Sequence, residues 1–88
     1  NSRHSCAVTK SGKLYCWGLN DRGSLGIGAS DGAKELEPKQ VELEDVKKVA
    51  LGPDYTCAIR EGGELYCWGR SVTADGRSES KPVRVRLR

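Results

Sequence analysis

Short apolar runs flank a polar turn in two stretches of this chain that match each other almost residue for residue. In residues 4–18 the runs lie on both sides of Lys10-Ser11-Gly12, and in residues 55–69 they lie on both sides of Glu61-Gly62-Gly63. β-Branched and aromatic residues that flank a short glycine-containing turn are typical of a β-hairpin. Each stretch is therefore expected to form one antiparallel pair of strands.

The turn in each stretch has three residues and ends in glycine. This composition is typical of a three-residue hairpin loop, whose last residue adopts a left-handed conformation that glycine enters freely. Counting outward from the middle of the loop places Cys6 opposite Cys16 and Cys57 opposite Cys67. Residues directly opposite on antiparallel strands have Cα atoms about 4.5 or 5.5 Å apart, which a disulfide accepts. We therefore predict one disulfide within each hairpin.

A structural zinc site is the alternative use of four cysteines, which by themselves allow three disulfide connectivities. Zinc ligands usually come in pairs two to four residues apart, whereas nine residues separate the two cysteines of each hairpin. The only histidine, His4, is replaced by Tyr55 in the second stretch. The disulfides are therefore preferred and no metal site is predicted. They indicate an oxidising location, which is extracellular, periplasmic or at the cell surface.

Each predicted hairpin has two apolar faces. One face carries the cysteines, and the other carries an alanine, a tyrosine and a tryptophan. A sheet that is apolar on both faces needs cover on both sides, as a propeller blade obtains from its neighbours. Residues that recur in both copies are assigned to structure, namely Gly12, Trp17 and Gly18 in the first and Gly63, Trp68 and Gly69 in the second.

The two copies are offset by 51 residues, a period typical of propellers and solenoids. Residues 40–43 and 46–51 are two further strand candidates, and residues 82–87 repeat the first of them. We divide the single module 1–88 into a partial first blade with its long loop, a four-stranded repeat, and a loop with a terminal edge strand. The corresponding ranges are 1–39, 40–70 and 71–88.

Four segments together resemble the repeats of the regulator of chromosome condensation family, which form β-propellers. They are residues 49–52, 55–59 and 63–69, and the glycine-rich segment 23–28. In that family the last of these is a turn that packs one blade against the next, and the second copy here has residues 72–77 in its place. The resemblance implies an all-β fold with two partial four-stranded antiparallel blades, which do not form a closed ring.

The resemblance also implies a range of functions, because members of this family act as nucleotide-exchange factors, chromatin-binding modules, ubiquitin-ligase scaffolds and secreted inhibitors. The predicted disulfides favour the secreted members. With fewer than two repeats, the apolar faces need cover from elsewhere. A fragment of a longer propeller and an oligomer are the favoured explanations, and a reduced module capped by charge is the third.

Composition is that of one small soluble domain. The chain has 88 residues, 31% of them charged, with a net charge of +3. No uncharged apolar run reaches the roughly 20 residues that span a bilayer, so no membrane insertion is predicted. The chain begins with polar residues, which indicates that any signal peptide has been removed or that the chain is a fragment.

Arginines gather at the end of the chain. Arg84, Arg86 and Arg88 alternate with apolar residues on the last predicted strand and place positive charge on one face of it. Such a row is able to bind a polyanion, but charged edge strands are also a common protection against aggregation. The solvated edge is the preferred interpretation, and nucleic acid is not the expected partner.

Loops carried on a rigid sheet are the favoured contact surface for a partner. Asn20, Asp21, Arg22 and Arg70 follow the two hairpins and are predicted to contribute to it, together with the arginine row. No catalytic triad, carboxylate pair or phosphate-binding loop is recognised, and no cofactor is predicted. We therefore expect a non-enzymatic module of a secreted or surface repeat protein that binds a protein partner or further copies of itself. The alternatives are a structural spacer within a larger surface protein and polyanion binding through the arginine row.

Overall fold

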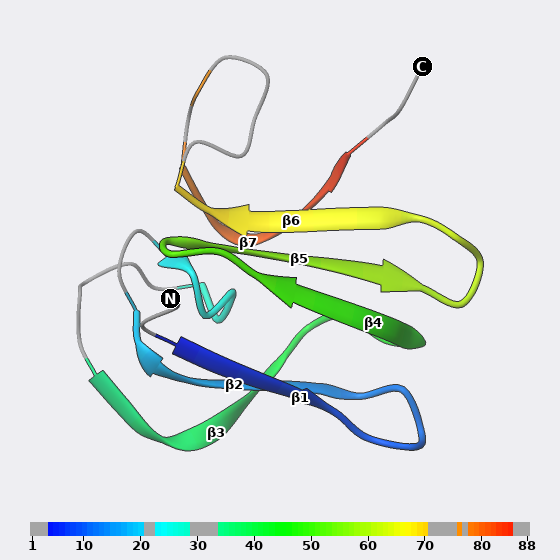
Figure 1. Ribbon diagram of the computed structural model, residues 1–88, viewed down its shortest axis with the longest axis horizontal. Coiled ribbons are helices and arrows are strands. Elements are labelled where there is room, and N and C mark those ends of the chain that lie inside the picture. Colours follow the sequence, from blue (N-terminus) through cyan, green and yellow to red (C-terminus); the bar gives the residue numbers. More distant parts are fainter. Residues whose placement is uncertain (1–3, 21–22, 29–33, 71–75, 77, 86–88) are drawn as a thin grey trace.

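The strands of the protein form two antiparallel sheets, shown in Figure 1. This computed structural model describes residues 4–20, 23–28, 34–70, 76 and 78–85. The first sheet consists of β1 (His4–Val8), β2 (Leu14–Leu19) and β3 (Lys34–Val41), in that order. The second sheet consists of β4 (Val46–Leu51), β5 (Tyr55–Arg60), β6 (Leu65–Gly69) and β7 (Glu79–Val85). The prediction of an all-β fold without a closed ring is confirmed.

Both hairpins have the register that their loops predict. Cys6 lies opposite Cys16 and Cys57 lies opposite Cys67, with Cα atoms 4.1 Å apart in each pair, and both pairs form disulfides. The glycine that ends each loop has a positive φ, +86° in one hairpin and +91° in the other. A left-handed residue at this position closes the three-residue loop and so fixes which residues face each other.

The third strand of the first sheet is longer than the sequence predicts. The pattern indicates a strand over residues 40–43, whereas β3 runs from Lys34 to Val41 and pairs with β2 near both of its ends, with a shift in register between Cys16 and Gly18. Charged residues and a proline occupy most of this strand, and they conceal it from a search for apolar alternation. The first sheet ends at Val41 and the second begins at Val46.

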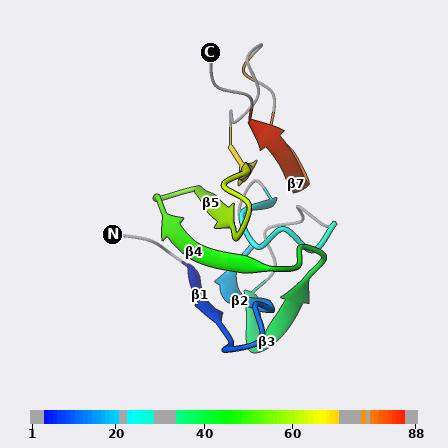
Figure 2. The ribbon, with the colours of Figure 1, turned by 90° about the vertical axis from the view of Figure 1, so that its right-hand side faces the viewer.

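The core lies between the two sheets, which Figure 2 shows one above the other. We name the side of each sheet that bears its disulfide the cysteine face, and the opposite side the tryptophan face. The first sheet contributes its cysteine face, with Leu14, Cys16 and Val41 fully buried. The second sheet contributes its tryptophan face, with Ala58 and Trp68 buried to at least 99%. The sheets therefore bury opposite faces of the same repeated motif.

The other two faces point away from this core. On the tryptophan face of the first sheet, Trp17 and Tyr15 remain partly exposed, although Trp68 at the equivalent repeat position is fully buried. On the cysteine face of the second sheet, Ile59 is 40% exposed. Each sheet thus buries one apolar face against the other sheet, and its opposite face is more exposed among the described residues, with the exception of Cys67 at 7%.

Candidate functional site

A turn at residues 23–28 joins the first sheet to the second. The Gly28 amide donates to the Ser80 carbonyl at 2.8 Å, and the Thr56 hydroxyl donates to the Ser24 carbonyl at 2.8 Å. Leu25 is fully buried in the core between the sheets. The turn therefore reaches from the end of β2 to β5 and β7, which is the packing role that the family resemblance implies.

Trp68 fills the space under this turn. A Cβ atom on Gly26 would lie 2.5 Å from Trp68 Nε1, closer than real Cβ atoms come to a neighbour, and Gly26 also has a φ of +73°. Both the close approach and the left-handed backbone require glycine at this position. The indole Nε1 is buried and has no hydrogen-bond acceptor among the described residues. Apolar contact, not a hydrogen bond, therefore fixes Trp68.

A buried chain of hydrogen bonds crosses the same interface. His4 Nε2 lies 2.6 Å from Thr56 Oγ1, and the two side chains are 4% and 0% exposed. The Thr56 hydroxyl donates its one proton to Ser24, so it accepts from His4. Nε2 therefore carries the imidazole proton, and Nδ1 is the unprotonated nitrogen. Three residues from three separate segments are held together in this way.

Burial lowers the pKa of His4 below its ordinary value of 6.5, and the carboxylate of Asp54 opposes this shift. A charged imidazolium would need an acceptor for a second proton on Nδ1. That nitrogen is buried and has no partner among the described residues. The interface therefore favours the neutral form of His4, which serves as a structural donor.

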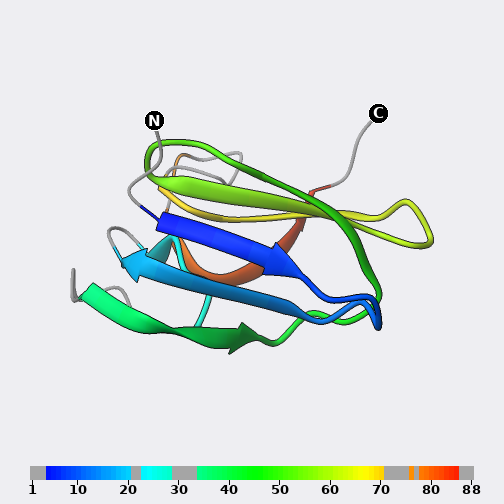
Figure 3. The ribbon, with the colours of Figure 1, turned by 60° about the horizontal axis from the view of Figure 1, so that its bottom comes forward.

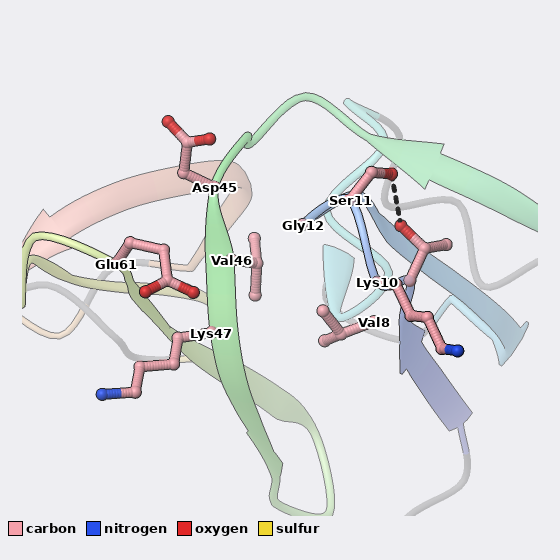
Figure 4. A pocket seen from close by; sticks show the side chains of 9 residues that line it. Val8, Lys10, Ser11, Gly12, Asp45, Val46, Lys47 and Glu61 are labelled. Atoms are coloured by element: carbon pink, nitrogen blue, oxygen red, sulfur yellow. Dashed lines mark hydrogen bonds between the residues drawn. The ribbon is translucent and has the colours of Figure 1, made fainter.

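A cleft of about 520 Å³ opens between the hairpin loop of the first sheet and the start of β4 (Figure 4). Val8 and Val46 form an apolar floor, and charged side chains surround it. The walls are held by backbone hydrogen bonds from Val46 to the Gly12 carbonyl, at 2.9 Å, and from Glu61 to the Asp45 carbonyl, at 2.7 Å. The rim is formed by Thr9, Lys10, Ser11, Asp45, Lys47 and Glu61.

The structure places Asn20 in the interior, not on the contact surface that the sequence predicts for it. The side chain is 1% exposed, and its Oδ1 accepts a hydrogen bond from the Leu25 amide at 3.2 Å. An amide side chain in this position shapes the turn from inside. Asp21 and Arg22, predicted for the same surface, lie outside the described residues.

The arginines of the predicted contact surface are spread over the molecule. Arg70 is exposed and pairs with Asp54, with 3.4 Å between Nη1 and Oδ2. Arg84 is exposed on β7, opposite Tyr66 on β6. Arg86 and Arg88 lie outside the described residues, so the row is represented by Arg84 alone. Leu36 on β3 is 79% exposed, and its place among charged residues gave no signal in the sequence.

No group of three or more residues able to hold a metal ion occurs in the part of the chain that the structure describes. Within the same residues, no helix is long and apolar enough to cross a membrane.

Two antiparallel sheets that follow each other along the chain and pack face to face define this protein as a repeat protein built from propeller-type blades. The family model of the Regulator of chromosome condensation (RCC1) repeat matches residues 11–59, and a second model of the same repeat matches residues 46–77. The chain belongs to this family.

Two relatives illustrate the sequence similarity. The chain is 37% identical over 93 residues to human Regulator of chromosome condensation, an alignment that covers 96% of the chain and 22% of the relative. It is 39% identical over 69 residues to the Ultraviolet-B receptor UVR8 of Arabidopsis thaliana, and this alignment covers 75% of the chain and 15% of the relative. The chain thus spans less than a quarter of the length of either relative.

Solved structures have the same arrangement of strands. A chain in the crystal structure of Kap60 bound to yeast RCC1 (Prp20) superposes with a TM-score of 0.81 and 25% identity, over 98% of this chain and 21% of that one. Human WBSCR16 superposes with a TM-score of 0.83 and 23% identity, over 97% of this chain and 23% of that one. These similarities confirm that the two sheets have the fold of RCC1-type propeller blades.

Proposed function

We propose that this chain is a non-enzymatic, protein-binding repeat module of a secreted or surface protein. The observation that carries the proposal is the pair of disulfides, one across each hairpin. Disulfides persist in oxidising compartments and are rare where thiols are kept reduced. A small domain that relies on two of them is suited to a location outside the cytoplasm.

Protein binding is supported by what relatives bind. One solved structure is of Kap60 bound to yeast RCC1, and another concerns the binding properties of Prp20p to Gsp1p and histones. A relative from yeast is named as a guanine nucleotide exchange factor, an activity exerted on another protein. Blades supply a rigid support, and exposed residues such as Arg70 and Arg84 provide contacts that differ between repeats.

The location is tested by producing the chain in the periplasm and in the cytosol of a bacterium and counting its free thiols. We expect no free thiol and resistance to proteolysis in the periplasmic protein, and four free thiols with rapid proteolysis in the cytosolic protein. Equal resistance of the fully reduced chain would contradict the proposed setting, because the disulfides would then be dispensable.

Binding is tested with a photoreactive amino acid in place of Arg84 in the secreted protein. The matched control position is Lys13, which is exposed and lies beside the hairpin loop of the first sheet. The proposal predicts one crosslinked protein of constant mass from position 84 and none from position 13. The absence of any crosslinked protein at position 84, or equal crosslinking at both positions, would count against this contact surface.

A further inference from the structure

Two arginines of the second sheet lie beside the same tyrosine. Arg84 on β7 is directly opposite Tyr66 on β6. Residues opposite each other on antiparallel strands point to the same side of the sheet, with Cβ atoms about 4.5–5.5 Å apart. The guanidinium carbon of Arg60 lies 5.9 Å from the centroid of the Tyr66 ring. Tyr66 is therefore a common neighbour of both arginines.

This cluster lies on the tryptophan face of the second sheet, near the end of the sheet that carries its hairpin loop. Tyr66 and Trp68 alternate with Cys67 on β6 and so share this face, which packs against the first sheet. Figure 3 shows that β7 runs toward the side of the molecule where both hairpin loops lie. The first sheet is in place on this face, and Arg84 is nevertheless exposed. Arg84 is therefore accessible beside the contact between the two sheets.

The two arginines differ in their partners. Arg60 Nε donates to the Glu44 carbonyl at 2.8 Å, and Arg60 Nη2 lies 3.6 Å from Oδ2 of Asp45. Arg84 forms no ion pair with any carboxylate in the part of the chain that the structure describes. The charge of Arg60 is thus offset by a neighbouring carboxylate, whereas the charge of Arg84 is available to a partner.

We propose that Arg84 binds one carboxylate, from an aspartate or glutamate side chain of the partner protein. This proposal rests on the protein-binding function and adds the chemistry of the group that is bound. A guanidinium presents two parallel N–H donors that match the two oxygens of a carboxylate. Tyr66 places aromatic surface beside Arg84, and interactions between charges are stronger where such surface excludes water.

The surroundings of Arg84 favour a single negative charge over a polyanion. A polyanion binds by neutralising several of its charges with successive lysines or arginines. The other arginine of this cluster, Arg60, is already paired with Asp45, whose side chain is 66% exposed. The carboxylate of Asp45 repels a second negative charge that approaches Arg60. The cluster therefore fits an isolated acidic side chain.

The probes are short peptides from a phage-displayed random library. They are selected on the whole chain and then counter-selected on the Arg84→Gln variant. The peptides that remain should share an aspartate or glutamate at one recurrent position. Their affinity for Arg84→Gln should be about tenfold lower, as expected for the loss of a hydrogen bond between charged groups. Arg84→Lys keeps the charge without the two parallel donors, so it should lose about threefold.

Lys13→Gln is the matched control, because Lys13 is exposed and its replacement removes the same charge. This variant should bind the selected peptides as the wild-type chain does. Changing the recurrent acidic residue of a peptide to its amide should lower the affinity by the same factor as Arg84→Gln. The two changes together should lose little more than either one alone, because they remove the same contact.

Four results would overturn the proposal. The first is that no peptide distinguishes Arg84→Gln from the wild-type chain, and the second is that those which do lack a recurrent acidic residue. The third is an equal loss with Lys13→Gln. The fourth is heparin, as a second probe, binding about tenfold more weakly to Arg84→Gln, because Arg84 would then serve a polyanion. Photocrosslinking at position 84 reports contact of any chemistry. A crosslinked partner together with any of these four results would retain the protein-binding function and reject the carboxylate.

Discussion

At the scale of single residues, the interface depends on a glycine that leaves room for a tryptophan. Gly26 has a left-handed backbone and lies against Trp68, whereas Gly63 has a similar backbone with nothing within 4 Å of its Cβ position. A substitution at Gly63 therefore tests the left-handed backbone alone, whereas a substitution at Gly26 tests the backbone together with crowding against Trp68. Comparing the two measures how much the packing of the turn at 23–28 on Trp68 contributes to stability.

Replacing Gly26 with alanine should destabilise the protein more than replacing Gly63 with alanine. Both substitutions cost about 1–2 kcal/mol for a left-handed backbone. Gly26→Ala adds overpacking against Trp68, which typically costs about 1–3 kcal/mol. Urea unfolding of the two variants measures the difference. Equal losses would mean that Trp68 moves aside without cost.

His4 should make the stability of the protein depend on pH. Its pKa is lowered by folding, so the folded protein binds fewer protons at this site than the unfolded chain. The contribution is fully present above the unfolded value of about 6.5 and is lost as the pH falls from there through the lower folded pKa. Asp54 is the charged group that opposes the shift.

The measurement is the free energy of unfolding between pH 7.5 and pH 4.5 in the wild-type protein and in His4→Gln. Glutamine retains a donor for Thr56 and does not titrate. The difference in stability between the two proteins should therefore shift in favour of His4→Gln as the pH is lowered. A constant difference across this range would show that His4 titrates equally in the folded and unfolded states.

At the scale of the elements, the two hairpins have the same loop, the same register and the same disulfide, yet they lie in different surroundings. Cys16 is fully buried in the core between the sheets. The disulfide of Cys57 and Cys67 lies on the cysteine face of the second sheet, outside that core, where Cys67 is 7% exposed and Cys57 is partly exposed. The bridges should therefore differ in what their removal costs.

Replacing both cysteines of a hairpin with alanine removes one bridge at a time. Each bridge closes a loop of equal length, for which the chain-entropy model gives about 2–3 kcal/mol. The variant of Cys6 and Cys16 should lose at least about 1 kcal/mol more than that of Cys57 and Cys67, because it also leaves a cavity in the core. Thermal unfolding of the two double variants provides the test. A larger loss in the second hairpin would contradict this account.

The sequence was sufficient to predict the hairpins because their loops and cysteines act locally. Three-residue loops ending in glycine set the register, and the register brought Cys6 to Cys16 and Cys57 to Cys67. The length of β3 was missed because most residues of this exposed strand are charged, so the strand shows no apolar pattern. The interior position of Asn20 was missed because it depends on the turn at 23–28, a contact between segments that no local pattern encodes.

At the scale of the whole molecule, the sequence left open which face of each hairpin is buried. The repeated motif is apolar on both faces, so the choice depends on the order of the sheets along the chain and on the turn between them. The bond between His4 and Thr56 joins positions 52 residues apart and was equally beyond a pattern search. That further blades or copies cover the two open faces remains a prediction.

The first sheet packs through its cysteine face and the second through its tryptophan face. Leu14 and Leu65 occupy equivalent positions on the cysteine faces, and Trp17 and Trp68 do so on the tryptophan faces. Leu14 and Trp68 are fully buried, whereas Leu65 and Trp17 are partly exposed. The two pairs should therefore respond to truncation in opposite order.

The most direct test is the free energy of unfolding of four single alanine variants at these positions. Leu14→Ala should cost about 2–5 kcal/mol and Trp68→Ala about 3–5 kcal/mol. Leu65→Ala and Trp17→Ala should each cost about 1 kcal/mol, as expected for partly exposed side chains. The larger loss should therefore fall on the leucine in the first hairpin and on the tryptophan in the second. Larger losses at both positions of one hairpin, or equal losses within each pair, would contradict this expectation.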